Sequence, residues 1–170
     1  MERAKEEIRK AMSKSKKNAD LHYYMGIIEL SQRNYSEAME YIERAIKYAD
    51  DSTARDYIAK ALCLACLAKF KEAVEDLEVT IKLEQNWIDA YFLKGKCSYL
   101  AGDINSAFMS YQQLVILEKK EYVMHIHAGN LLMNTGAIED AIKAFTNANR
   151  LKESSVAFYQ QAKVLLILTK

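Results

Sequence analysis

The residues best suited to chemistry in this chain are three cysteines and three histidines, and their spacing limits what they can do. Cys63 and Cys66 form a C-x-x-C motif. The motif falls in the middle of a helical pattern between Ala61 and Leu67, without the strand-and-helix setting of a redox motif. The other possible metal ligands are scattered at Cys97, His22, His125 and His127. A zinc site needs four ligands, so we interpret the cysteines as buried packing residues.

His125 and His127 are two residues apart, so on a helix they point to different faces and cannot share one metal ion. The sequence contains no glycine-rich phosphate loop, no nucleophile elbow and no His-Glu-x-x-His motif. An active site would have to be assembled from residues that show no chemical pattern. We therefore expect no catalytic residue, no metal site and no cofactor, and we do not expect an enzyme.

Helices must position these residues, because the 170-residue chain contains no proline and only five glycines. A fixed period appears when the chain is aligned on one recurring alanine. The spacings are 35, 34 and 34 residues, and a further step back reaches Ala4. The aligned residues are Ala38, Ala73, Ala107 and Ala141. A period of this length indicates a solenoid of repeated helix pairs.

Other positions recur in the same register. Twelve residues before each alanine stands a small residue, namely Gly26, Ala61, Gly95 or Gly129. Gly102 and Gly136 each precede their alanine by five residues, where a helix must end with positive φ. Large side chains recur at Tyr35, Phe70, Ile104 and Ile138, and at Ile42, Leu77, Tyr111 and Phe145. We expect the small residues to let two helices approach closely and the large ones to form the core.

With this period, and with segments such as DAYFLKGKCSYLAGD, the chain resembles the tetratricopeptide repeat family. The resemblance implies an all-α fold, a right-handed superhelical α-solenoid of antiparallel helix pairs. Full repeats would span 19–52, 54–87, 88–121 and 122–155. Residues 1–18 would be the second helix of a partial repeat, and 156–170 the first helix of a further repeat or a capping helix. The chain departs from the family pattern at unit position 4, which holds histidine or tyrosine, and at position 32, which lacks proline.

Charge and composition exclude several partners. The chain carries 24 basic and 23 acidic residues, so no global field draws it to nucleic acid. This near-neutrality also counts against the RNA-binding pentatricopeptide repeats, a related family of helical pairs. Three cysteines form no disulfide framework, no secretory signal opens the sequence, and the longest apolar stretches, 62–67 and 164–168, are too short for membrane insertion. We expect a cytoplasmic protein.

The resemblance places a partner-binding groove along the first helices of the repeats. The groove residues would be Tyr23, Ile27, Leu30, Ile58, Leu62, Phe92, Lys96, Tyr99, Ile126, Asn130 and Met133. This apolar, partly aromatic stripe suits an amphipathic helix or an extended apolar peptide segment of a partner protein, with Phe92 and Tyr99 as anchors. More of the parent polypeptide is an alternative occupant.

Some family members clamp the acidic C-terminal tail of a chaperone with Lys, Asn and Arg. In one frame the five clamp positions here hold Tyr23, Ile27, Ala59, Asp89 and Leu93, and in the next they hold Ile58, Leu62, Leu93, Val123 and His127. We therefore do not expect binding of chaperone tails. A second hypothesis is self-association through the last helix, where we expect an uncovered run of Val164, Leu165, Leu166, Ile167 and Leu168.

Overall fold

A computed structural model describes residues 2–117, 122–152 and 155–168, together with their side chains except those at 115, 123, 124, 155 and 166–168. All regular secondary structure in these ranges is α-helix. The chain divides into two compact units, residues 1–85 and 86–170. Within the described ranges, no helix is long and apolar enough to cross a membrane.

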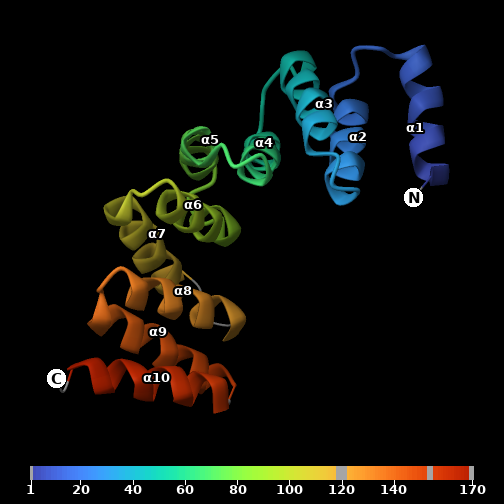
Figure 1. Ribbon diagram of the computed structural model, residues 1–170. Helices are drawn as coiled ribbons and strands as arrows, with labels where there is room; N and C mark the ends of the chain where they lie inside the picture. The colour runs from blue at the N-terminus through green and yellow to red at the C-terminus, as the bar shows by residue number, and fades with distance from the viewer. Residues whose placement is uncertain (1, 118–121, 153–154, 169–170) are drawn as a thin grey trace. The chain divides into compact units, whose positions relative to one another are not determined.

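The first unit contains one single helix followed by two helix pairs. Its helices are α1 (Glu2–Lys14), α2 (Ala19–Ser31), α3 (Tyr35–Tyr48), α4 (Ala54–Cys66) and α5 (Phe70–Leu83). The closest packing is between α2 and α3 and between α4 and α5, while α3 also packs on α4 and α1 on α2 (Figure 1). Each pair is joined by a three-residue turn, which brings the two helices together antiparallel.

The second unit reverses this order, since two helix pairs are followed by a single helix. Its helices are α6 (Ile88–Leu100), α7 (Ile104–Leu117), α8 (Tyr122–Asn134), α9 (Ile138–Leu151) and α10 (Ser155–Leu168). The pairs are α6 with α7 and α8 with α9, and α10 lies against α9 (Figure 1). The all-α solenoid of helix pairs expected from the sequence is confirmed.

Short polar side chains set the beginnings of several helices. Asn18 accepts a hydrogen bond from the backbone N–H of Leu21 at 3.0 Å, and Asp103 accepts one from Ser106 at the same distance. Before α4, the backbone N–H of Thr53 donates to Asp56 at 2.9 Å, which forms part of a capping box. These bonds satisfy amide groups that have no partner inside the helix.

Left-handed turn residues separate the helices of each pair. Gly102 has φ of 85° and Gly136 has φ of 80°, so the turn role expected for both glycines is confirmed. The equivalent positions in the first unit are also left-handed, but they hold Arg33, with φ of 66°, and Ala68, with φ of 58°. A residue with a Cβ atom is strained in this conformation, so the first unit stores strain that the second avoids.

The small residues of the first helices permit close crossings with the second helices. A Cβ atom added to Gly26 would lie 2.6 Å from Cδ1 of Ile42, and one added to Gly95 would lie 2.5 Å from Cζ of Tyr111. Ile42 and Tyr111 are fully buried. The predicted packing of a large residue against a small one is thus confirmed at these crossings. Ile104, the first residue of α7, was also expected in the core, but it is 41% exposed, so this expectation is wrong.

The single helices at the two ends dock on their neighbours in different ways. On α1, Lys5 is buried and its ammonium group pairs with Glu29 of α2 at 2.7 Å. On α10, Val164 is fully buried in the core cluster of the second unit. The expectation that Val164 is uncovered is therefore wrong, because the side of α10 that carries it faces α9. Leu165 is 47% exposed, and the side chains of Leu166, Ile167 and Leu168 lie outside the described residues.

Candidate functional site

The two cysteines of the C-x-x-C motif lie in different surroundings. Cys63 is buried among Ala38, Ile42 and Ala59, as expected, whereas Cys66 is exposed on the same helix, so the buried packing role expected for Cys66 is wrong. Burial raises the pKa of the Cys63 thiol to about 12, so this thiol stays protonated and unreactive at neutral pH. Among the described residues, no group of three or more His, Cys, Asp or Glu side chains is placed to hold a metal ion.

The two neighbouring histidines of α8 lie in different surroundings. His125 is 1% exposed, whereas His127 is an exposed residue. The His127 ring meets the ring of Phe92 on α6 nearly edge-on, with 5.8 Å between their centroids. His127 therefore belongs to the surface formed by the first helices, and His125 to the interior of its helix pair.

The predicted groove residues of the first unit lie on α2 and α4. Tyr23, Ile27 and Leu30 are half-buried and pack along the core cluster of Ala38, Ile42, Ala59 and Cys63. Leu62 is 37% exposed, but Ile58 is only 9% exposed and offers little surface to a partner. The accessible part of this half is therefore an apolar strip on α2 with Leu62 of α4 beside it.

Arg55 ties the beginnings of α2 and α4 together on this face. Its guanidinium group lies 3.1 Å from Asp20, 3.6 Å from Asp56 and 4.1 Å from the centre of the Tyr23 ring. Burial raises the pKa of Tyr23, although the positive charge of Arg55 opposes that change. The phenol thus stays neutral, and its ring is covered by a cation that is itself held by two carboxylates. Sequence spacing did not reveal this cluster, because it forms between two repeats.

The predicted groove residues of the second unit lie on α6 and α8. Phe92 and Tyr99 of α6 and Ile126 and Met133 of α8 are half-buried and pack against the core of this unit. Asn130 is half-buried, while Lys96 is exposed. This half therefore offers two aromatic rings, two aliphatic side chains and one cation on its first helices.

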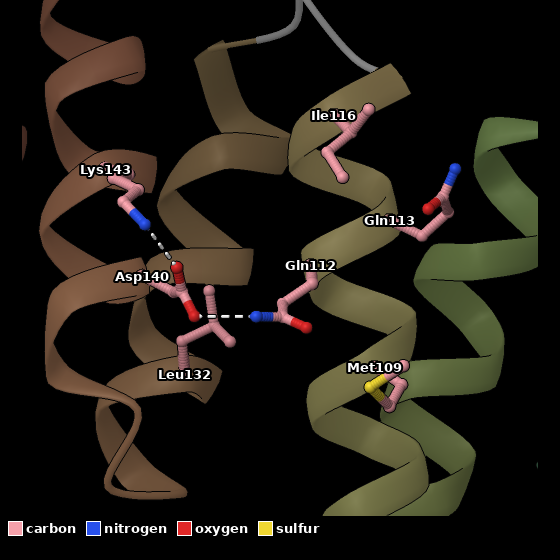
Figure 2. A pocket seen from close by; sticks show the side chains of 7 residues that line it. All are labelled: Met109, Gln112, Gln113, Ile116, Leu132, Asp140 and Lys143. Atoms are coloured by element: carbon pink, nitrogen blue, oxygen red, sulfur yellow. Dashed lines mark hydrogen bonds and ion pairs between the residues drawn. The ribbon is translucent and has the colours of Figure 1, made fainter.

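A second concave surface lies on the opposite helices of this unit and was missed from the sequence. A hollow of about 450 Å³ opens between α7 and α9 above Leu132 of α8 (Figure 2). We call it the α7 hollow, and it is lined by Met109, Gln112, Gln113, Ile116, Leu132, Asp140 and Lys143. Asp140 accepts hydrogen bonds from Gln112 at 2.8 Å and from Lys143 at 2.9 Å. The bond from Lys143 is the main reason that the pKa of Asp140 is lowered, so this carboxyl is ionised at neutral pH.

The corresponding surface of the first unit has a different chemistry. The residues of α3 that correspond in register to those of α7 line a hollow of about 260 Å³, and they are Glu40, Glu43, Arg44 and Lys47. Their counterparts on α7 are Met109, Gln112, Gln113 and Ile116, and α7 carries no charged residue from Ile104 to Leu117. That uncharged run is the sequence signal that would have identified the α7 hollow.

Comparison with known proteins agrees with the architecture. Residues 19–52 match the family model of the tetratricopeptide repeat. The protein YrrB, described as "a TPR protein with an unusual peptide-binding site", superposes with a TM-score of 0.76 at 20% identity, over 95% of this chain and 83% of YrrB. Residues 19–52 are therefore similar to a tetratricopeptide repeat, and the chain shares its fold with a tetratricopeptide repeat protein.

Two further proteins are similar to this chain. MamA from Desulfovibrio magneticus RS-1, residues 41 to the end, superposes with a TM-score of 0.80 at 21% identity, over 91% of this chain and 86% of that one. DnaJ homolog subfamily C member 7 of Mus musculus is 27% identical over 106 residues, which are 62% of this chain. The match spans only 21% of that mouse protein, about a fifth of its length.

Proposed function

We propose that this tetratricopeptide repeat chain is a scaffold for protein–protein interaction whose first-helix face binds an apolar or amphipathic segment of a partner. In each unit this face carries large apolar side chains that the helix pairs leave half-exposed. Phe92 and Tyr99 are the strongest candidates for anchors, because aromatic residues dominate the energetics of interfaces. Stacked helix pairs bind partners on such faces in many repeat proteins.

The polar groups on the face indicate the kind of segment that fits. Lys96 is exposed beside Phe92, and Arg55 already has two carboxylate neighbours in the first unit. An amphipathic helix with an acidic residue near Lys96 would match the second unit. The clamp positions for an acidic chaperone tail hold none of the Lys, Asn and Arg residues of the clamp, and Asp89 at one of them is acidic, so the proposed partner is not such a tail.

The proposal also includes a cytoplasmic location and a role without catalysis. The three cysteines are thiols with no disulfide between them, which suits the reducing cytoplasm. The proposed role is that of an adaptor in complex assembly. It involves no catalysis, and the buried thiol of Cys63 is assigned to packing. A second candidate role is self-association through the terminal helices, which the exposed Phe158 and Leu165 of α10 favour.

Affinity capture with matched variants tests the proposal. Phe92→Glu combined with Tyr99→Glu should lose the proteins captured by the unmodified chain, and the charge reversal Lys96→Glu should weaken their capture without touching the core. Met109→Glu is the control, because Met109 is 63% exposed and lies in the α7 hollow on the opposite helices. Circular dichroism checks that all variants keep their helices. Equal capture by the groove variants and by Met109→Glu would contradict the proposal.

A further inference from the structure

In every complete helix pair, three residues of the first helix recur in one register, and the middle residue lies at the crossing with the second helix. They are spaced by four and then three residues, and the middle one is always small. The four triplets are His22–Gly26–Glu29, Tyr57–Ala61–Leu64, Tyr91–Gly95–Ser98 and His125–Gly129–Leu132. All four middle residues are buried. A Cβ atom added to Gly95 would lie directly against the ring of Tyr111. We call this triplet the pairing face of a first helix.

Helix α10 carries the same triplet, but nothing described in the structure covers it. Phe158, Ala162 and Leu165 have the four-and-three spacing, with an aromatic residue first and a small one in the middle. Phe158 is 53% exposed, Leu165 is 47% exposed and Ala162 is exposed. Tyr159, beside this triplet, is also exposed. The equivalent residues of α8, Gly129 and Leu132, are buried by their helix pair. A second helix packed on α10 would remove a comparable surface from water.

The opposite side of α10 packs against α9. Ala157 and Val164 are fully buried, and between them the Gln161 side chain donates to Thr146 at 3.0 Å and accepts from Asn149 at 2.9 Å. Both of these partners lie on α9. Helix α10 is thus a first helix that docks correctly on the preceding repeat and presents its own pairing face to solvent.

Helix α1 has the register of a second helix but lacks a first helix of its own repeat in the described structure. The second helices carry a small residue, a large residue and a third residue at four-and-three spacing, all at most 1% exposed, as in Ala38–Ile42–Ala45 and Ala141–Phe145–Ala148. On α1 the matching residues are Ala4, which is exposed, and Ile8 and Ala11, which are half-buried. Lys5 fixes α1 to α2 through Glu29. Helix α1 is therefore a second helix, and no first helix packs on these three residues in the described structure.

We propose that α1 of one copy packs on the pairing face of α10 of another copy and completes a tetratricopeptide repeat between two chains. The sizes match, because Ile8 and Ala162 correspond in register to Leu77 and Ala61 of the complete repeat of α4 and α5, where both residues are fully buried. The charges match as well, since the two triplets are uncharged. Burying Phe158, Leu165 and Ile8 supplies the apolar area. This proposal rests on the second candidate role, self-association through the terminal helices, and no residue of the first-helix groove takes part in it.

The contact is heterologous, joining the head of one chain to the tail of the next. Contacts of this kind build rings or open chains. A single helix pair buries less area than a standard interface of roughly 1,600 Å², so we expect a weak, concentration-dependent association.

Sedimentation of the 170-residue chain over a concentration range up to about 1 mM tests the proposal, because weak interfaces require such concentrations. We expect its average mass to rise with concentration. Ile8→Glu should block the head, and Ala162→Arg should block the tail. Each variant alone should sediment as a monomer, and circular dichroism checks that each is folded. Met109→Glu, on the α7 hollow, should associate like the unmodified chain.

The decisive experiment mixes the variant Ile8→Glu with the variant Ala162→Arg. The free tail of Ile8→Glu and the free head of Ala162→Arg should combine into a 1:1 dimer and nothing larger. A monomeric unmodified chain at every concentration would overturn the proposal, as would a mixture that stays monomeric. Self-association of Ile8→Glu would show tail-to-tail pairing of α10 instead, and capture of a different helix by α10 without any self-association would assign the face to another partner.

Discussion

Lys5 of α1 and Glu29 of α2 form an ion pair of 2.7 Å in which the two side chains are only 10% and 2% exposed. Glu29 also accepts a hydrogen bond from Asn34 at 2.9 Å, and Lys5 donates one to Gln32 at 2.8 Å. The carboxylate is therefore fully enclosed by groups that favour its charged form. This cluster is the principal polar link between the single helix α1 and the first helix pair.

Removing one partner of this pair should release α1. We expect Lys5→Met to weaken the docking of α1 by about 3–5 kcal/mol, because it leaves a buried carboxylate without its cation. Hydrogen exchange of the α1 amides measures the loss. The double variant Lys5→Met, Glu29→Met should recover much of the protection, since apolar side chains of similar volume can replace a buried pair. Protection of α1 that is unchanged in Lys5→Met would contradict this role.

The same pair should make the docking of α1 sensitive to acid. Burial alone would raise the pKa of Glu29, but the hydrogen bonds from Asn34 and Lys5 and the charge of Lys5 outweigh it, so the pKa is lowered from 4.5. A lowered pKa contributes stability above the unfolded value, and this stability is lost as the pH falls through the folded value. The exchange difference between the native chain and Glu29→Gln should therefore be constant near pH 7 and vanish below the folded pKa. A difference that does not shrink as the pH is lowered from neutral through the acid range would refute this link.

The crossing of α6 and α7 should not accept even one methyl group. A Cβ atom at position 95 would lie 2.5 Å from the buried Tyr111 ring, so we expect Gly95→Ala to destabilise the chain by about 1–2 kcal/mol. This is the net effect, because alanine by itself favours a helix by about 1 kcal/mol over glycine. Urea unfolding followed by circular dichroism measures the change. Adding Tyr111→Leu should restore stability in part, since it reproduces the Ala61 and Leu77 combination of the preceding repeat, and stabilisation by Gly95→Ala alone would show that the crossing is loose.

The left-handed turns should respond oppositely in the two units. Ala68 has φ of 58°, so Ala68→Gly should stabilise the first unit by up to about 1 kcal/mol by relieving strain. Gly102 has φ of 85° and open space around it, so Gly102→Ala should destabilise the second unit by about 1 kcal/mol through strain alone. Thermal unfolding of the pair of variants compares the two effects. Shifts of the same sign in both variants would contradict the turn assignment.

The period of the sequence was sufficient to predict the helix pairs, because one register accounts for the turn residues Gly102 and Gly136 and the crossing residues Gly26 and Gly95. It did not reveal the left-handed conformation of Arg33 and Ala68, since neither residue type favours it. It also placed Val164 on the surface. An apolar run such as Val164 to Leu168 does not show which side of a helix meets its neighbour, and only the docking on α9 decides that.

Site features that depend on contacts between repeats were beyond the sequence pattern. The cluster of Arg55, Asp20 and Tyr23 joins residues more than thirty positions apart, with side chains that are unremarkable in the sequence. The α7 hollow depends on the approach of Asp140 to Gln112 across two helices. The assignment of the groove residues to a binding surface stays a prediction, because it was taken from the family resemblance.

The most direct measurement of the proposed function is photo-crosslinking from single positions of the folded chain. A photoreactive amino acid replaces Tyr99 on the first-helix face or, as the matched control, Met109 in the α7 hollow, and adducts formed in cell lysate are identified by mass spectrometry. We predict that the probe at position 99 captures a defined amphipathic or apolar segment of a partner and that the probe at position 109 does not. Equal labelling from both positions, or specific labelling from position 109 alone, would contradict partner binding on the first-helix face.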